Sequence, residues 1–161
     1  MPGASSTHIS TYAFGIDGGN IVGYYSDSSK HGFSYDGSAY STVAYPGKSN
    51  TYAYGIDGDY IVGGGDRRGF KYDRTTDAGI AANYTSIQLP NEMGNEIGGT
   101  GYVYPRDIDG SKIVGHFGST QVGNFRGFLY DEDASTYTTL HVPGASMDLS
   151  PWYSTLQSHG W

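Results

Sequence analysis

Three landmarks recur in the same order three times along this chain, and this repetition is the strongest constraint on its fold. The landmarks are an Asp-Gly pair that precedes Ile-Val-Gly, a Gly-Phe-x-Tyr-Asp run, and a proline. They lie at 15–23, 32–36 and 46 in the first unit, at 55–63, 69–73 and 90 in the second, and at 107–115, 127–131 and 143 in the third. The recurrence of the same landmarks in the same order along a chain is typical of a repeat architecture.

Each unit predicts four short β-strands. An Asp-Gly pair between apolar stretches favours a tight hairpin, because glycine adopts a positive φ without a Cβ clash. In the first unit we expect 12–17 to pair with 21–25, and 32–36 and 40–45 to form the third and fourth strands. Pro46 ends the last strand, since proline cannot donate to the ladder. The later units contain longer connections at 74–83, 91–101 and 119–124.

Composition agrees with a fold made of strands and turns. The chain contains 26 glycines and 16 tyrosines, and only 37% of its residues are hydrophobic. Four strands in about 40 residues is the size of one propeller blade. We therefore predict an all-β fold, a β-propeller with three four-stranded blades over residues 1–146. The expected blades are about 2–45, 46–89 and 90–143.

The residues of the first unit carry a family resemblance. The run Gly-Ile-Asp-Gly-x-x-Ile-Val-Gly-Tyr-Tyr at 15–25, followed by His31-Gly32-Phe33-Ser34-Tyr35, resembles the bacterial extracellular HAF-type repeat. The resemblance covers about residues 8–143 and implies β-propeller-like repeats in a secreted or extracellular parent. It implies little about activity, since these repeats are mostly of unknown role.

This chain departs from the HAF-type pattern at two sets of positions. The family often has asparagine where Asp17, Asp57 and Asp109 stand. The family's histidine before Gly-Phe is present only as His31, and arginines replace it at Arg68 and Arg126.

Both ends of the chain resemble junctions between units. Residues 2–5 read Pro-Gly-Ala-Ser, as do residues 143–146, so we expect three whole units taken from a longer array or from an assembling protein. Known propellers have at least about four blades, and three blades would leave two open edges. We therefore expect a two-fold homodimer that completes a six-bladed ring. Residues 147–161, with both tryptophans, are either an interface segment or a disordered tail.

The repeated aspartates Asp17, Asp57 and Asp109 have two explanations that stay open at this point. Aspartate before glycine is a turn residue that hydrogen-bonds its own backbone. In a closed ring, however, the three carboxylates would lie at equivalent depths and could hold Ca²⁺, which prefers carboxylate and carbonyl oxygens.

Two further sets of side chains also have alternative explanations. His31, Arg68 and Arg126 occupy equivalent positions before Gly-Phe. They either form exposed ion pairs with Asp36, Asp73 and Asp131, or they form a surface that recognises anionic or carbonyl-bearing ligands. The many aromatic rings either pack between blades or stack on sugars.

The sequence favours a repeat-type binding or structural module whose loops capture a small molecule, a glycan or a partner protein. The alternative is a calcium-dependent hydrolase of the lactonase or esterase type, by analogy with other propeller enzymes. In it, Asp17, Asp57 and Asp109 would bind Ca²⁺, and His116 or His31 would act as the base. There is no cysteine and no Gly-x-Ser-x-Gly motif, so nucleophilic catalysis has no candidate of those types.

Charge and hydropathy bear on the expected partners and location. The net charge of −7 would repel a phosphate backbone, so we do not expect nucleic acid as a partner. No apolar run approaches membrane-spanning length, so we do not expect a membrane as a partner. Residues 1–7 have no signal-peptide character, and the sequence itself assigns no localisation.

Overall fold

The computed structural model of the protein describes residues 10–75, 81–90, 101–119, 124–140 and 142. These residues form three separate four-stranded antiparallel sheets. Sheet 1 contains β1 (Ser10–Asp17), β2 (Asn20–Ser26), β3 (Lys30–Tyr35) and β4 (Tyr40–Val43). Sheet 2 contains β5 (Tyr52–Asp57), β6 (Tyr60–Gly65), β7 (Arg68–Asp73) and β8 (Tyr84–Ile87). Sheet 3 contains β9 (Tyr102–Asp109), β10 (Lys112–Ser119), β11 (Asn124–Asp131) and β12 (Thr136–Leu140). The prediction of an all-β chain with three four-stranded units is confirmed.

Within each sheet the strands follow one another in chain order, and each pairs with the next. The Asp-Gly pairs form the first hairpin turns as expected, with positive φ values of 54°, 53° and 56° at Gly18, Gly58 and Gly110. The fourth strand of sheet 1 ends at Val43, earlier than the predicted Tyr45. The reason is that the Tyr45 N–H donates to Thr51 Oγ1 at 3.0 Å instead of to the ladder.

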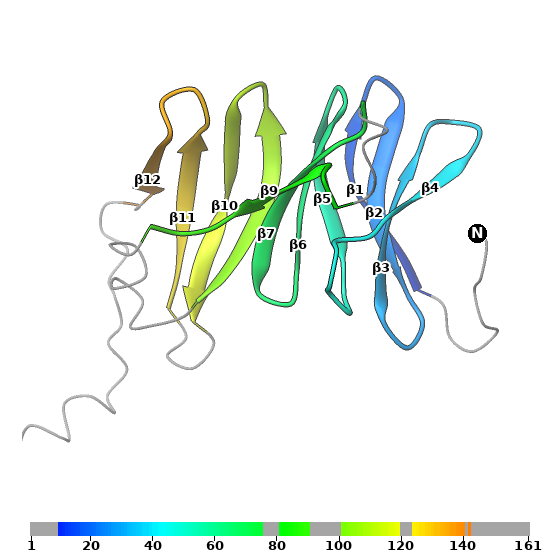
Figure 1. Ribbon diagram of the computed structural model, residues 1–161, viewed down its shortest axis with the longest axis horizontal. Helices are drawn as coiled ribbons and strands as arrows, with labels where there is room; N and C mark the ends of the chain where they lie inside the picture. Colours follow the sequence, from blue (N-terminus) through cyan, green and yellow to red (C-terminus); the bar gives the residue numbers. More distant parts are fainter. Residues whose placement is uncertain (1–9, 76–80, 91–100, 120–123, 141, 143–161) are drawn as a thin grey trace, which may run out of the picture.

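The three sheets stand side by side in the order of the chain (Figure 1). Sheets 1 and 2 enclose one apolar cluster, to which Val22 and Val43 come from sheet 1 and Ile56, Ile61 and Phe70 from sheet 2. Each of these side chains is at most 5% exposed. Burying one such side chain stabilises the fold by about 1.5–3 kcal/mol, so this contact is a main source of stability.

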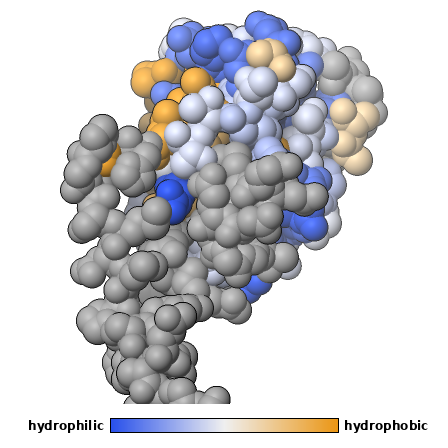
Figure 2. All heavy atoms as spheres, turned by 90° about the vertical axis from the view of Figure 1, so that its left-hand side faces the viewer, coloured by the Kyte–Doolittle hydropathy of each residue, from blue (hydrophilic) through white to orange (hydrophobic). Residues whose placement is uncertain are grey.

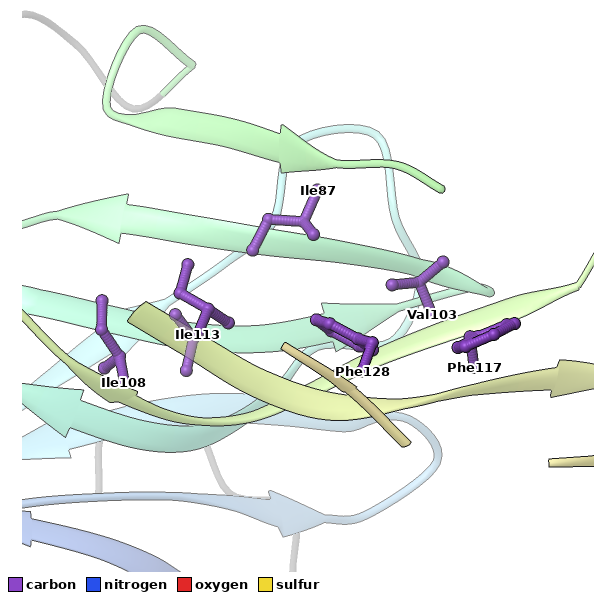
Figure 3. Close-up of a cluster of buried hydrophobic side chains, with 7 residues drawn as sticks. Ile87, Val103, Ile108, Ile113, Phe117 and Phe128 are labelled. Atoms are coloured by element: carbon purple, nitrogen blue, oxygen red, sulfur yellow. The ribbon is translucent and has the colours of Figure 1, made fainter. Parts of the chain in front are cut away.

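Sheets 2 and 3 enclose a second cluster at the equivalent place (Figure 3). Val62 and Ile87 of sheet 2 take the places of Val22 and Val43, and Ile108, Ile113 and Phe128 of sheet 3 take those of Ile56, Ile61 and Phe70. The same sheet-to-sheet interface is therefore present twice within the chain.

The first strands of the sheets come into close backbone contact. A Cβ added to Gly15 would lie 2.8 Å from the Tyr54 carbonyl oxygen, and one added to Gly55 would lie 2.7 Å from the Asp107 Cα. These two glycines are needed because a side chain there would force the first strands of neighbouring sheets apart. In the described part of the chain, no helix is long and apolar enough to cross a membrane.

Candidate functional site

The repeated aspartates link neighbouring sheets. The Gly58 N–H of sheet 2 donates to Asp17 Oδ2 of sheet 1 at 2.9 Å. The Gly110 N–H of sheet 3 donates to Asp57 Oδ2 of sheet 2 at 2.7 Å. Each carboxylate thus fixes the Asp-Gly turn of the following sheet. Neither the local turn role nor the metal role considered from the sequence includes this bond, which is visible only once the sheets are placed together.

Asp109 is the third member of this set and stands at the end of the series. Within the described ranges, no further sheet follows sheet 3 to supply a turn N–H to its carboxylate. Nor do any three described His, Asp or Glu side chains gather as a metal-binding group. The predicted Ca²⁺ site at Asp17, Asp57 and Asp109 stays a prediction.

The two histidines proposed as bases lie in different sheets and have different partners. His31, on β3, has its Nε2 3.1 Å from Asp27 Oδ1, and its ring stacks on Tyr25. His116, on β10, has its Nδ1 3.5 Å from Arg106 Nε and contacts the Phe125 ring. Burial, together with the nearby Arg106 charge, lowers the pKa of His116, which favours its neutral form. The structure does not bring the two histidines into one site.

Among the contacts of the described residues, His31, Asp36 and Asp73 have partners other than those expected for edge ion pairs. His31 pairs with Asp27, and the Asp131 carboxylate pairs with Lys112 at 3.1 Å. Asp36 and Asp73 instead accept hydrogen bonds from backbone N–H groups of their own turns, as aspartates commonly do.

A pocket opens between sheets 2 and 3, with a volume of about 320 Å³. It is lined by two tyrosines of β9 and one of β5, and by three polar residues that flank strands of sheet 2. These residues are Tyr52, Tyr102, Tyr104, Asn50, Asp66 and Arg67.

The pocket coincides with a missing aromatic ring in the repeat. In sheet 1, Tyr24 faces Tyr12 on the neighbouring strand, and its ring also contacts Tyr52 of sheet 2, 4.8 Å away between centroids. The residue equivalent to Tyr24 in sheet 2 is Gly64, which pairs with Tyr52. A Cβ on Gly64 would lie 3.2 Å from the Arg68 carbonyl oxygen, which is a tight contact, and 3.5 Å from Tyr104 Cδ1. By this equivalence, a ring at position 64 would extend towards Tyr52 and Tyr104, which both line the pocket, although Gly64 itself does not.

The polar side of the pocket is built on a strained turn. Asp66 and Arg67 both have positive φ, at 45° and 78°, although neither is glycine. Such backbone costs about 1–3 kcal/mol per residue and is concentrated at functional sites. The turn directs the Asp66 carboxylate to the Ser49 N–H and Asn50 Nδ2, at 2.9 and 3.2 Å. It also places the Arg67 guanidinium 5.0 Å from the Tyr102 ring centroid.

The charge states in the pocket follow from these contacts. The hydrogen bonds from Ser49 and Asn50 lower the pKa of Asp66, which remains ionised near neutral pH. Burial raises the pKa of the Tyr52 and Tyr104 hydroxyls, so both remain neutral. The pocket therefore combines neutral aromatic walls with one anion, one cation and one amide.

The sequence alone did not identify this pocket. A signal was present, because Gly64 stands where the other units have Tyr24 and His116. A difference between equivalent positions indicates a cavity only when the packing around it is known. No known family model, curated protein or solved structure matches the chain. The resemblance to HAF-type repeats therefore stays a prediction.

Proposed function

We propose that this protein is a β-propeller-type module that binds a small glycan in the pocket beside Gly64. The observation that carries the proposal is the pocket of about 320 Å³ lined by Tyr52 and Tyr104, next to the position at which Gly64 replaces an aromatic ring. In the other inter-sheet junction, Tyr24 occupies the equivalent place. A flat ring of similar size is therefore the shape that the pocket accepts.

The chemistry of the lining favours a sugar ring over a purely aromatic ligand. Tyrosine faces suit the apolar C–H face of a pyranose. The side-chain oxygens of Asp66 and Asn50 each already accept one protein N–H, and their remaining lone pairs, together with the Arg67 donors, could bond ring hydroxyls. Since one carboxylate and one guanidinium lie together in the lining, a neutral sugar suits the site better than a strongly charged ligand.

The description of the sheets as propeller blades, completed to a six-bladed ring by a second copy, belongs to the same proposal. So does a secreted or extracellular parent of the HAF type. The repeated interface between neighbouring sheets supports the propeller. Nothing in the described residues favours the calcium-dependent lactonase, which stays a prediction of the sequence.

A direct test is isothermal titration of the full chain with a panel of neutral mono- and disaccharides. We expect at least one sugar to bind, and the Gly64→Tyr variant to lose binding by more than about tenfold, because the new ring would fill the pocket. A second variant, Tyr104→Ala, removes one wall and is expected to weaken binding without filling the space.

The matched control is Thr85→Tyr, which adds the same side chain to an exposed position on β8. Thermal melting shows whether each variant is folded. The proposal is wrong if no sugar in the panel binds, or if the folded Gly64→Tyr and Tyr104→Ala variants bind as well as the unchanged protein.

A further inference from the structure

The interface that joins neighbouring sheets has two different halves, and each end of the molecule carries one of them uncovered. To the interface with the sheet that follows, a sheet contributes apolar side chains from its second and fourth strands and a close backbone contact from its first strand. It contributes mainly its first three strands to the interface with the sheet that precedes it. Sheet 3 has no following sheet within the described residues, and sheet 1 has no preceding one.

At the sheet 3 end, the residues that the repeat buries elsewhere are exposed. Val114 is equivalent to Val22 and Val62, which are both fully buried, yet it is 39% exposed. Leu140 is equivalent to Val43 and Ile87, and it is 49% exposed where they are 1% and 3%. Figure 2 faces this end of the molecule, and apolar residues are visible on its surface.

At the sheet 1 end, the first-strand part of the complementary half is exposed, whereas Phe33, the equivalent of Phe70 and Phe128, is only 4% exposed. Ile16 is 71% exposed, whereas its equivalents Ile56 and Ile108 are each 5% exposed. Ala13 is also exposed, although its equivalent Ala53 is fully buried between sheets 1 and 2. The two ends therefore carry the two halves of one interface that the chain already forms twice.

The backbone hydrogen bonds between sheets follow the same repeat. The Thr51 N–H donates to the Lys30 carbonyl at 2.8 Å, and the Val103 N–H donates to the Arg67 carbonyl at 3.2 Å. The equivalent donor at the sheet 1 end is the Thr11 N–H, and the equivalent acceptor at the sheet 3 end is the Phe125 carbonyl. The aspartate series continues likewise, from the Asp109 carboxylate to the Gly18 N–H.

We propose that a second copy of this chain binds head to tail, with sheet 3 of one copy against sheet 1 of the other. Asp109 of each copy accepts a hydrogen bond from the Gly18 N–H of the other, as Asp57 does from Gly110. Leu140 and Val114 pack on Ile16 as Ile87 and Val62 pack in the second cluster. Because both ends are used, two identical joins form and close the ring.

The number of copies follows from the number of sheets. Propellers have about 4–8 blades, and six is the only multiple of three in this range. Two copies of three sheets each therefore make the ring. This inference rests on the proposal that the sheets are propeller blades, but it is independent of the sugar pocket, which lies inside one chain.

The first experiment is light scattering of the full chain at micromolar concentration, where we expect twice the chain mass of 17.3 kDa. Ile16→Asp and Leu140→Asp each alter one end and are each expected to weaken the dimer by at least about tenfold, because a carboxylate would be buried without a partner. Thr85→Asp places the same charge on the middle sheet and is expected to leave the dimer unchanged.

Mixing the two end variants tests the head-to-tail arrangement. Each variant keeps one intact end, so an equal mixture forms one sound join and gives a heterodimer at concentrations where each variant alone is monomeric. A join between like ends would behave differently, since one of the two variants alone would still dimerise.

Two outcomes overturn the proposal. One is that the unchanged protein is a monomer at micromolar concentration, for example because its own residues 147–161 cover the sheet 3 end. The other is that the Ile16→Asp and Leu140→Asp variants both still form the dimer. Sugar titration of the same samples separates the two proposals. A monomer that binds sugar at Gly64 overturns only the join, and a dimer that binds none overturns only the glycan site.

Discussion

The carboxylate of Asp57 accepts a hydrogen bond from the backbone N–H of Gly110, with 2.7 Å between Oδ2 and N, and so connects the first hairpin turns of two sheets. Asp17 makes the equivalent bond to Gly58. Charge-assisted bonds of this kind are stronger than neutral ones, but these lie at an exposed position, where water competes.

We expect Asp57→Ala to lower the free energy of unfolding by about 1 kcal/mol, because the Gly110 N–H loses its acceptor. Asp57→Asn is the matched control, since its side-chain oxygen can still accept the bond, and it should retain most of the stability. Denaturant unfolding at one fixed protein concentration measures both variants. Equal stability of the alanine and asparagine variants would show that the carboxyl oxygen contributes nothing.

His116 is expected to make the fold sensitive to mild acid. Its pKa in the folded protein lies below the ordinary 6.5, mainly because of burial and also because of Arg106. The unfolded chain therefore binds the proton more readily than the folded protein does. As the pH falls below about 6.5, the free energy of unfolding decreases for this reason. Above that pH, His116 is neutral in both states and does not change the free energy of unfolding with pH.

The test compares the pH dependence of unfolding for the unchanged protein and for His116→Gln. Between pH 7 and pH 5, we expect the unchanged protein to lose more stability than the variant. Arg106→Gln should reduce the difference, since it removes the neighbouring charge, although loss of its contact with Tyr54 lowers stability at every pH. Parallel curves for the unchanged protein and His116→Gln would contradict the prediction.

Asp107 is expected to hold the two copies slightly apart at the proposed join. Gly15 and Gly55 are its equivalents, and within the chain a Cβ at either would collide with the next sheet's backbone. Asp107 carries a Cβ at that place, which would face the second copy in the proposed dimer. Asp107→Gly should therefore allow closer packing and lower the dimer dissociation constant several-fold, as measured by sedimentation.

The control for this change is Asp109→Ala, which removes the proposed acceptor for Gly18 and should weaken the same dimer. A tighter Asp109→Ala dimer, or a weaker Asp107→Gly dimer of unchanged thermal stability, would argue against the arrangement at the first strands.

The sequence predicted the strands well because their signals are local. An Asp-Gly turn, an alternating apolar run and a proline each act within a few residues, so the three four-stranded sheets follow from them. The early end of β4 was missed because it depends on Thr51, which lies six residues beyond Tyr45 and competes for its N–H.

The site was harder to predict because it depends on contacts between units. The Asp17 carboxylate accepts a hydrogen bond from Gly58 in the next sheet. Turn chemistry alone predicts instead that this carboxylate bonds the backbone of its own loop. The pocket depends on a residue that is smaller than its equivalents. Gly64 resembles any strand glycine until Tyr52 and Tyr104 are placed on either side of it.

The hydrogen bonds that Asp17 and Asp57 accept from the turn of the following sheet have a consequence for how such genes change. Because every sheet meets its neighbours through the same contacts, deleting or duplicating one whole unit leaves ends that still match each other. To form the proposed six-bladed ring, a chain of two units would need three copies, and a chain of six units would need only itself. In the proposed six-bladed ring, subunit number and gene length are then exchangeable wherever the number of units per chain divides six. A chain of four units, made by one duplication, would not fit that ring.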